Sequence, residues 1–196
     1  EADSMHSYET KLCLIQFASA GRLAIIDPLS IPHDSLLGLL DLIDEAEVVW
    51  MHGADYDMAM FRKTFGRIPA AVWDTQTAAR LLGFEQFGLA NLIEAEYGVT
   101  LSKASQKADW GRRPLTEKML SYAFNDVRYI VPMARSFVHR LEECGRMSWF
   151  IESCDSAREY AANREERPSE EAWRVNGWGS LDRLGMAYLK ALWYWR

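Results

Sequence analysis

Cysteine is scarce in this sequence, and the few cysteines present are not arranged for bonding. There are only three in 196 residues, and Cys13, Cys144 and Cys154 have neither a zinc-like nor a redox-like spacing. This argues against a disulfide-stapled secreted domain. Buried or idle thiols in a reducing compartment are the simplest interpretation, so we expect a cytoplasmic protein.

Long apolar runs and a hydrophobic leader are also lacking. No apolar stretch reaches the roughly 18 residues that a membrane helix needs, so we expect no membrane partner. Residues 1–4 (Glu-Ala-Asp-Ser) are acidic and polar, unlike a signal peptide. Apolar residues still make up 49% of the chain and charged residues 26%, which is typical of a globular protein with a substantial core.

A net positive charge is missing as well. The formal net charge is −6, whereas nucleic-acid-binding domains are more often basic. A site that holds divalent cations must, however, concentrate carboxylates, and these can hide a local basic patch from the total. The overall charge therefore leaves the kind of partner undecided.

The apolar pattern predicts strands that alternate with helices after an initial hairpin. The predicted strands are 12–18, 22–27, 47–51 and 71–73, and the predicted helices are 34–44, 55–65, 75–82, 88–97 and 116–143. The last helix should be interrupted or bent near Pro132, and residues 101–115, which have no clear period, should form a functional loop. This order indicates an α/β domain with mixed strand directions.

The chain divides by composition into three parts. They are a domain over 1–150, a helix and linker over 151–169, and a second helical unit over 170–196. The last part is too short to bury a core of its own. The buried strand at 12–18 has no partner for its other edge, and the aromatic cluster at 192–196 has nothing to pack against. We therefore expect a strand before Glu1 and further helices after Arg196.

Three acidic positions are candidates for a two-metal phosphodiesterase site: Glu1, Asp57 and Asp126. Such chemistry needs three or four carboxylates from different elements, which hold two Mg²⁺ or Mn²⁺ ions about 3.5–4 Å apart. Hard cations demand oxygen ligands, so Asp and Glu are the appropriate donors.

Two of these acids also have an ordinary structural interpretation. Asp57 follows the strand 47–51, at the strand end where α/β proteins place ligands, but Asp55 or Asp57 can equally cap the next helix. Glu1, with Asp3 two residues on, can be a solvated terminal acid without a role. The sequence pattern alone leaves both alternatives open.

Tyr122 and Asp126 lie one helical turn apart and therefore share a helix face. A phenol in that position can hydrogen-bond a water that a metal on Asp126 activates. Alternatively, Tyr122 is a core aromatic, and Asp126 pairs with Arg128 or Lys118.

Residues 103–118 form a basic stretch within an acidic protein. Its basic residues are Lys103, Lys107, Arg112, Arg113 and Lys118, against only Asp109 and Glu117. Such a stretch suits phosphates, and Trp110 within it either stacks on a base or sugar or packs into the core. His52 either contacts a nucleic-acid substrate or is structural. The candidate nucleic-acid contacts are His52, Lys103, Gln106, Trp110, Arg112 and Arg113.

The order of these motifs resembles the DEDDy 3′-5′ exonucleases, and ribonuclease D most closely. The second motif of that family is similar to residues 52–57 and the third to residues 122–126. Further similarity lies in the hairpin of 11–16 and 26–28 and in 73–82, 88–92 and 103–115. The resemblance covers roughly residues 1–150 in collinear order.

The resemblance implies a fold and a set of roles. The fold is a ribonuclease H-like mixed five-stranded sheet flanked by helices, followed by the start of a small all-helical domain like the helicase-and-RNase-D C-terminal (HRDC) domain. Glu1, Asp57 and Asp126 would be metal ligands, and Tyr122 would orient the attacking water. The first motif of the family is Asp-x-Glu; its Glu falls on Glu1, and its Asp lies two residues upstream.

The implied activity is metal-dependent hydrolysis of the 3′-terminal phosphodiester of RNA, such as a tRNA precursor or another structured RNA, with release of 5′-mononucleotides. No organic cofactor is implied. One alternative is the same chemistry on single-stranded DNA, and another is a catalytically silent nucleic-acid-binding scaffold. Retention of Asp57, Tyr122 and Asp126 argues against the scaffold, because a binding module has no need of clustered carboxylates that repel phosphate.

Overall fold

The computed structural model describes residues 1–3, 6, 10–164 and 169–195. The chain divides into two units, Glu1–Ala162 and Asn163–Arg196. Part of the expected linker, residues 165–168, and the terminal Arg196 lie outside the described residues.

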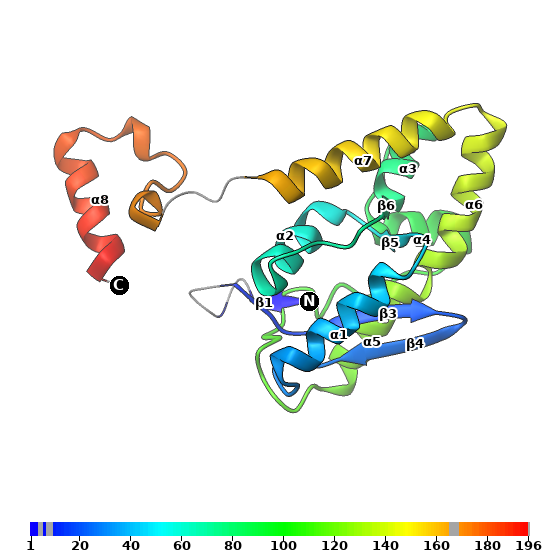
Figure 1. The fold of residues 1–196 in the computed structure, drawn as a ribbon, viewed down its shortest axis with the longest axis horizontal. Helices are drawn as coiled ribbons and strands as arrows, with labels where there is room; N and C mark the ends of the chain where they lie inside the picture. Colours follow the sequence, from blue (N-terminus) through cyan, green and yellow to red (C-terminus); the bar gives the residue numbers. More distant parts are fainter. Residues whose placement is uncertain (4–5, 7–9, 165–168, 196) are drawn as a thin grey trace. The chain divides into compact units, whose positions relative to one another are not determined.

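The first unit is a mixed α/β structure, as predicted (Figure 1). Its strands are β1 (Ala2–Asp3), β2 (Lys11–Leu12), β3 (Ile15–Ser19), β4 (Arg22–Ile26), β5 (Val49–Met51) and β6 (Val72–Asp74). Its helices are α1 (His33–Asp44), α2 (Ala54–Phe65), α3 (Thr75–Leu81), α4 (Leu89–Tyr97), α5 (Glu117–Arg128), α6 (Ile130–Glu143) and α7 (Met147–Asn163). Residues 101–115 form the expected loop between α4 and α5.

The described strands form three two-stranded pairs instead of the single five-stranded sheet that we expected. β1 pairs antiparallel with β2, β3 antiparallel with β4, and β5 parallel with β6. A groove lies between the hairpin β3–β4 and the pair β5–β6, and both β3 and β5 line it.

The predicted helix 116–143 is two helices, α5 and α6, that meet at Tyr129. The break comes three residues before Pro132. Proline has no N–H to donate, and its ring clashes with the carbonyl four residues earlier, which here belongs to Arg128. At its other end, α5 is capped by Thr116, whose side chain accepts a hydrogen bond from the Met119 N–H.

The hairpin β3–β4 is covered by α1 on one face and by α5 on the other (Figure 1). Successive side chains of a strand point to opposite faces. Ile15 accordingly packs with Leu36 and Leu40 of α1, whereas Leu14 packs with Ala123 of α5. This alternation fixes the face of α5 that meets the hairpin.

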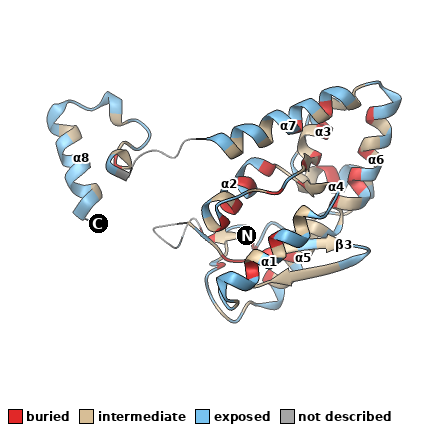
Figure 2. Cartoon of the chain, viewed as in Figure 1, coloured by how far each residue is buried: buried red, intermediate tan, exposed pale blue. Residues whose placement is uncertain are grey.

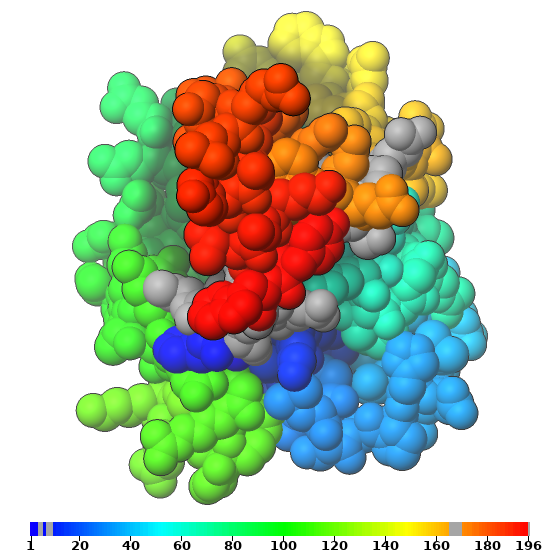
Figure 3. Space-filling view, turned by 90° about the vertical axis from the view of Figure 1, so that its left-hand side faces the viewer, coloured from blue at the N-terminus to red at the C-terminus, as the bar shows by residue number. Residues whose placement is uncertain are grey.

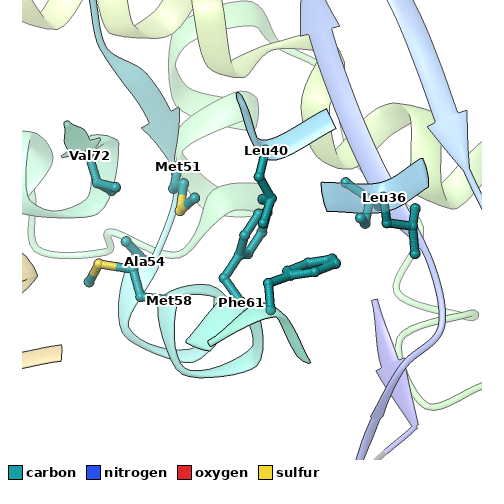
Figure 4. Close-up of a cluster of buried hydrophobic side chains, with 9 residues drawn as sticks. Leu36, Leu40, Met51, Ala54, Met58, Phe61 and Val72 are labelled. Carbon is teal, nitrogen blue, oxygen red and sulfur yellow. The ribbon is translucent and has the colours of Figure 1, made fainter. Parts of the chain in front are cut away.

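The side chains of β5 and β6 also alternate between two faces, and other elements cover both faces of this pair. Met51 and Val72 join a cluster with α1 and α2, where Met58 and Leu40 also lie (Figure 4). On the other face, Trp50 and Trp73 pack edge to face with centroids 5.2 Å apart. Both indoles also contact the ring of Phe150 on α7, at 5.9 and 5.4 Å.

The second unit contains two 3-10 turns, η1 (Ser169–Glu171) and η2 (Trp178–Ser180), and one helix, α8 (Arg183–Trp195). Trp173 is buried beside Trp178, but no described residue of α8 is buried (Figure 2). Leu184, Tyr188 and Leu192 recur every four residues along α8 and are exposed; α8 is the red end of the chain in Figure 3. None of the described helices has the length and apolar character to cross a membrane.

Phe150→Ala tests the packing of α7 on the pair β5–β6. Phe150 is fully buried, so removing its ring should lower the free energy of unfolding by about 3–5 kcal/mol, as large-to-small changes of aromatic residues in cores do. Urea unfolding followed by circular dichroism measures the loss. Trp149→Ala is the matched control, because the neighbouring Trp149 is 58% exposed. An equal effect of both changes would contradict the role of Phe150.

Candidate metal and nucleic-acid site

Glu1 is held by backbone hydrogen bonds to the segment that leads into β3. Its amino group donates to the Leu14 carbonyl (2.6 Å) and to Gln16 Oε1 (3.2 Å). Its own carbonyl accepts from the N–H groups of Cys13 (2.9 Å) and Leu14 (3.0 Å). Because Cys13 and Leu14 are fully buried, Glu1 is tied to a rigid part of the core.

Asp57 lies in the first turn of α2, directly after β5. The chain enters α2 through Gly53, whose φ of +67° favours glycine and whose N–H donates to Asp74 Oδ1 (2.8 Å). The same oxygen of Asp74 accepts from the Gln76 N–H (2.9 Å) and caps α3, as predicted. Asp74 therefore joins the ends of both parallel strands. Neither Asp55 nor Asp57 caps α2, because Gly53 occupies the N-cap position.

The surroundings of Asp57 disfavour its ionised form. Its position in the concave groove reduces its solvation and raises its pKa, and the negative charges of Glu1 and Asp74 raise this pKa further. A carboxylate kept among other carboxylates in this way is suited to bind a cation.

Asp126 and Tyr122 project from α5 toward the same acids. Burial raises the pKa of Asp126, and its hydrogen bond and charge repulsion with Glu1 raise this pKa further, as does Asp57. Burial, together with Asp126 and Glu1, holds the pKa of Tyr122 well above its ordinary value, so the phenol stays protonated and can donate a hydrogen bond. No ion pair within the described residues joins Asp126 to Arg128 or Lys118, the structural alternative considered above.

All four predicted catalytic residues line one groove of about 920 Å³. They are Glu1, Asp57, Tyr122 and Asp126. Its walls are β3 on one side and β5 on the other, with α5 contributing Tyr122 and Asp126. Acids that are up to 125 residues apart in the sequence thus meet in one place, where they alter one another's protonation.

Three of the candidate nucleic-acid contacts, His52, Lys103 and Gln106, also line the groove. Burial lowers the pKa of His52, so its ring is neutral. The Thr75 hydroxyl donates to the Met51 carbonyl (3.0 Å) and must therefore accept from His52 Nδ1 (2.9 Å). This buried Thr75, which the sequence did not single out, thereby sets the tautomer of His52.

Trp110 is a core residue, and the prediction that it stacks on a base is wrong. The side chain is only 1% exposed and packs with Leu14, Met119 and Ala123. Its ring also contacts that of Tyr122, with centroids 6.0 Å apart. Trp110 therefore supports the helix that carries Tyr122 and is not accessible to a substrate.

Arg113 is also structural, which corrects its assignment as a phosphate contact. Its Nε and Nη2 donate to the carboxylate of Asp27 at 2.7 and 2.6 Å. The remaining N–H groups donate to the carbonyls of Trp110 (2.8 Å), Arg112 (2.8 Å) and Cys13 (2.9 Å). All five donors of the guanidinium are thus used. Arg112 is exposed but is not part of the described lining of the groove.

A second group of possible metal ligands, Asp3, His6 and Asp109, lies outside the described lining of the groove. Their ligand atoms are within 4.8 Å of one another. His6 already contacts Asp3 through its backbone N–H (2.8 Å) and its Nδ1 (3.4 Å), and the Asp109 carboxylate accepts from the Gly111 N–H (3.1 Å). Each of these bonds is local to its own segment, residues 3–6 or residues 109–111.

Comparison with known proteins agrees with this geometry. A family model described as "3′-5′ exonuclease" matches residues 1–142. The chain belongs to this family. It is 36% identical to ribonuclease D of Sphingobium indicum over 194 residues, which are 97% of the chain but 49% of that protein. The chain thus spans about half the length of the curated relatives it matches.

Solved structures of similar proteins have the same fold. The structure of Escherichia coli RNase D, "an exoribonuclease involved in structured RNA processing", aligns with a TM-score of 0.76 at 32% identity, over 88% of this chain and 46% of that one. Brucella melitensis NrnC with bound Mg²⁺ aligns with a TM-score of 0.67 over 89% of this chain and 81% of that one. At 21% identity, the second match shows the fold alone. The ribonuclease H-like class is therefore confirmed.

Asp27→Asn tests the clamp between Arg113 and the hairpin. The hydrogen bonds from Arg113 hold the pKa of Asp27 at about 2, below its ordinary 3.8. Because folding lowers the pKa of Asp27, its ionised carboxylate stabilises the fold at pH values above the pKa that Asp27 has in the unfolded state. This stabilisation is lost as the pH falls toward 2. We expect a loss of about 1–2 kcal/mol at pH 7, after allowance for solvent screening, that shrinks below pH 4.

Urea titrations at pH 7 and pH 3 measure this difference. Glu47→Gln, which changes an exposed acid, should have no comparable effect at either pH. A destabilisation by Asp27→Asn that is equal at pH 7 and pH 3 would show that the ion pair is not its cause.

Proposed function

We propose that this chain is the catalytic part of a cytoplasmic, metal-dependent 3′-5′ exoribonuclease that hydrolyses the 3′-terminal phosphodiester of RNA and releases 5′-mononucleotides. The convergence of Glu1, Asp57 and Asp126 with a protonated Tyr122 in one groove carries the proposal. Membership of the 3′-5′ exonuclease family supports it.

The donor set of the groove fits divalent cations. The acids raise one another's pKa, and a bound dication would relieve the repulsion. Oxygen donors of this kind suit Mg²⁺ or Mn²⁺, and we propose that Glu1, Asp57 and Asp126 hold two such ions. When bound, a pair of this type supplies a water of lowered pKa and charge stabilisation for the leaving 3′ oxygen.

The protein groups around the acids have separate roles in this proposal. Tyr122 donates its phenolic hydrogen bond to the attacking water and fixes its direction. Lys103 provides a positive charge for a phosphate of the substrate. Gln106 and the neutral His52 contact the terminal nucleotide from the same groove.

RNA is the proposed substrate because the solved Escherichia coli relative, at 32% identity, is described as an exoribonuclease involved in structured RNA processing. Precursors of tRNA belong to this class. Discrimination against DNA depends on contacts to the 2′-hydroxyl, so DNA is the direct competitor in the test. Clustered acids repel phosphate unless cations are bound, which argues against a silent scaffold.

We also propose that a strand preceding Glu1 runs along β3 and β5 in the part of the groove beside the acids and unites the strand pairs into one sheet. Glu1 and Leu14 exchange both backbone hydrogen bonds, which is the pattern of an antiparallel pair. The N–H groups of Cys13 and Leu14 both donate to Glu1, as in a β-bulge. Continued upstream, this register pairs the residue two before Glu1 with Gln16, on the same face as the Glu1 side chain. The unit Asn163–Arg196 is proposed as the start of an HRDC-like domain.

Asp57→Asn and Asp126→Asn should abolish trimming of a 3′-labelled oligoribonucleotide by the full-length protein, since each removes a metal-binding carboxylate. Tyr122→Phe should keep metal binding but lower kcat by about 10²-fold or more, because a positioned proton donor is lost. Denaturing gels with Mn²⁺, with EDTA and with a matched DNA strand measure these effects.

Asp55→Asn is the matched control, because Asp55 lies in the same turn of α2 but is not part of the groove lining. Binding of the oligonucleotide without any shortening by the unmodified protein would favour the scaffold. Faster trimming of DNA than of RNA would overturn the substrate assignment alone.

Hydrogen exchange tests the proposed strand. Since the Leu14 N–H points toward Glu1, the alternation of a strand directs the N–H groups of Gln16 and Ala18 to the same side, away from β4. In a protein that includes the upstream segment, these two amides should exchange as slowly as those of Ile15 and Phe17. Fast exchange at Gln16 and Ala18 alone would contradict the strand.

A further inference from the structure

A second cavity, of about 630 Å³, lies at the turn of the hairpin β3–β4. It is lined by the turn residues 18–23, by Arg128 at the end of α5, and by Val131, Pro132 and Arg135 of α6. Its described lining contains three arginines, Arg22, Arg128 and Arg135, and no acidic residue. We call it the arginine cavity.

The three guanidinium groups are available to a ligand. Arg22, Arg128 and Arg135 are exposed, and no ion pair joins any of them to a carboxylate in the part of the chain that the structure describes. The lack of carboxylate partners for these three arginines is unexpected, because acidic residues outnumber basic ones in the chain, 28 to 22. Arg113 and Arg140, in contrast, each pair with a carboxylate.

Three different elements bring these arginines together. Ala20 and Gly21 have φ values of 48° and 75°, as in the tight turns that join hairpin strands, and this turn places Arg22 opposite Ser19. The break between α5 and α6 at Tyr129 redirects the chain (Figure 1). Arg135 then follows the lining residue Val131 by four positions, on the same face of α6.

The position of the arginine cavity relates it to the catalytic groove. Ala18, Ser19 and Val131 line both. The hairpin turn is separated from Leu14, which pairs with Glu1, by the length of β3, about 16 Å for five residues. This distance corresponds to roughly five stacked nucleotides, so one RNA molecule can contact both places.

We propose that the arginine cavity binds phosphates in the base-paired body of a structured RNA while its 3′ end lies at the carboxylates. Arginine suits this role, because its planar guanidinium binds phosphate oxygens in pairs. The strand proposed above occupies the part of the groove along β3 and β5, so the RNA body reaches the cavity over the outside of the domain. The inference rests on the proposed function and extends it to the choice of substrate.

The test compares two RNAs with the full-length protein: a hairpin with a four-nucleotide 3′ tail, and the tail alone. In the triple variant Arg22→Ala, Arg128→Ala, Arg135→Ala, the KM for the hairpin should rise at least tenfold, while kcat and the trimming of the tail stay unchanged. The salt dependence of hairpin binding, log Kd against log[salt], should lose about one unit of slope for each arginine.

Two further variants complete the design. The triple change to lysine, which keeps the charge, should retain most of the salt slope. Arg158→Ala on α7, which lines neither cavity, should behave as the unmodified protein does. Circular dichroism melts establish that each variant is folded.

An unchanged KM and salt slope for the hairpin in the folded alanine variant would overturn the proposal, as would an equal loss on the tail alone. Failure of the unmodified protein to trim either RNA would instead contradict the proposed function. The salt slope of hairpin binding, measured without turnover, separates these two results.

Discussion

The rest of this structure depends on one constraint, the mutual repulsion of the carboxylates of Glu1, Asp57 and Asp126 in the catalytic groove. Asp57 and Asp126 are held where desolvation and neighbouring charges raise their pKa, an arrangement that opposes folding unless a cation offsets it. Rigid elements keep them there. Backbone pairing with Leu14 holds Glu1, and a glycine turn bonded to Asp74 sets the start of the helix that carries Asp57. Functional sites commonly contain locally unfavourable arrangements of this kind, and the favourable free energy of the surrounding packing must exceed their cost.

The C-terminal part of the loop 101–115 supports the elements that carry the acids and does not line the groove. Trp110 fills the core beneath Tyr122, and Arg113 uses all five donors to join the loop to the hairpin. Only its first part, with Lys103 and Gln106, reaches the groove. Basic charge is therefore divided between a structural clamp, Arg113, and groups that we propose as phosphate contacts. The arginines at the hairpin turn, for which the described residues show no ion pair, belong to the second kind.

Much of the local structure followed from the sequence, because it is decided by near neighbours. The helices end where Gly66 and Gly98 adopt positive φ, Asp74 caps α3, and Pro132 divides the long helix. The hairpin and the parallel pair lie where apolar runs predicted them. The number of strands in one sheet could not be predicted in this way, because it depends on which distant edges meet; the described strands form three separate pairs.

The sequence by itself determined which residue types were available and in what order: three acids and a tyrosine with collinear similarity to an exonuclease family. Only the tertiary structure decided that Glu1, Asp57, Tyr122 and Asp126 share one groove, since contacts between residues so far apart depend on how whole elements pack. The tertiary structure also decided whether Trp110 and Arg113 are structural or accessible, which the local sequence pattern left open. An exposed Trp110 and a buried one have the same sequence neighbours, and Arg113 is clamped by distant partners, among them Asp27, 86 residues away. Burial and pairing are properties of the packed chain, and for that reason they had to be observed.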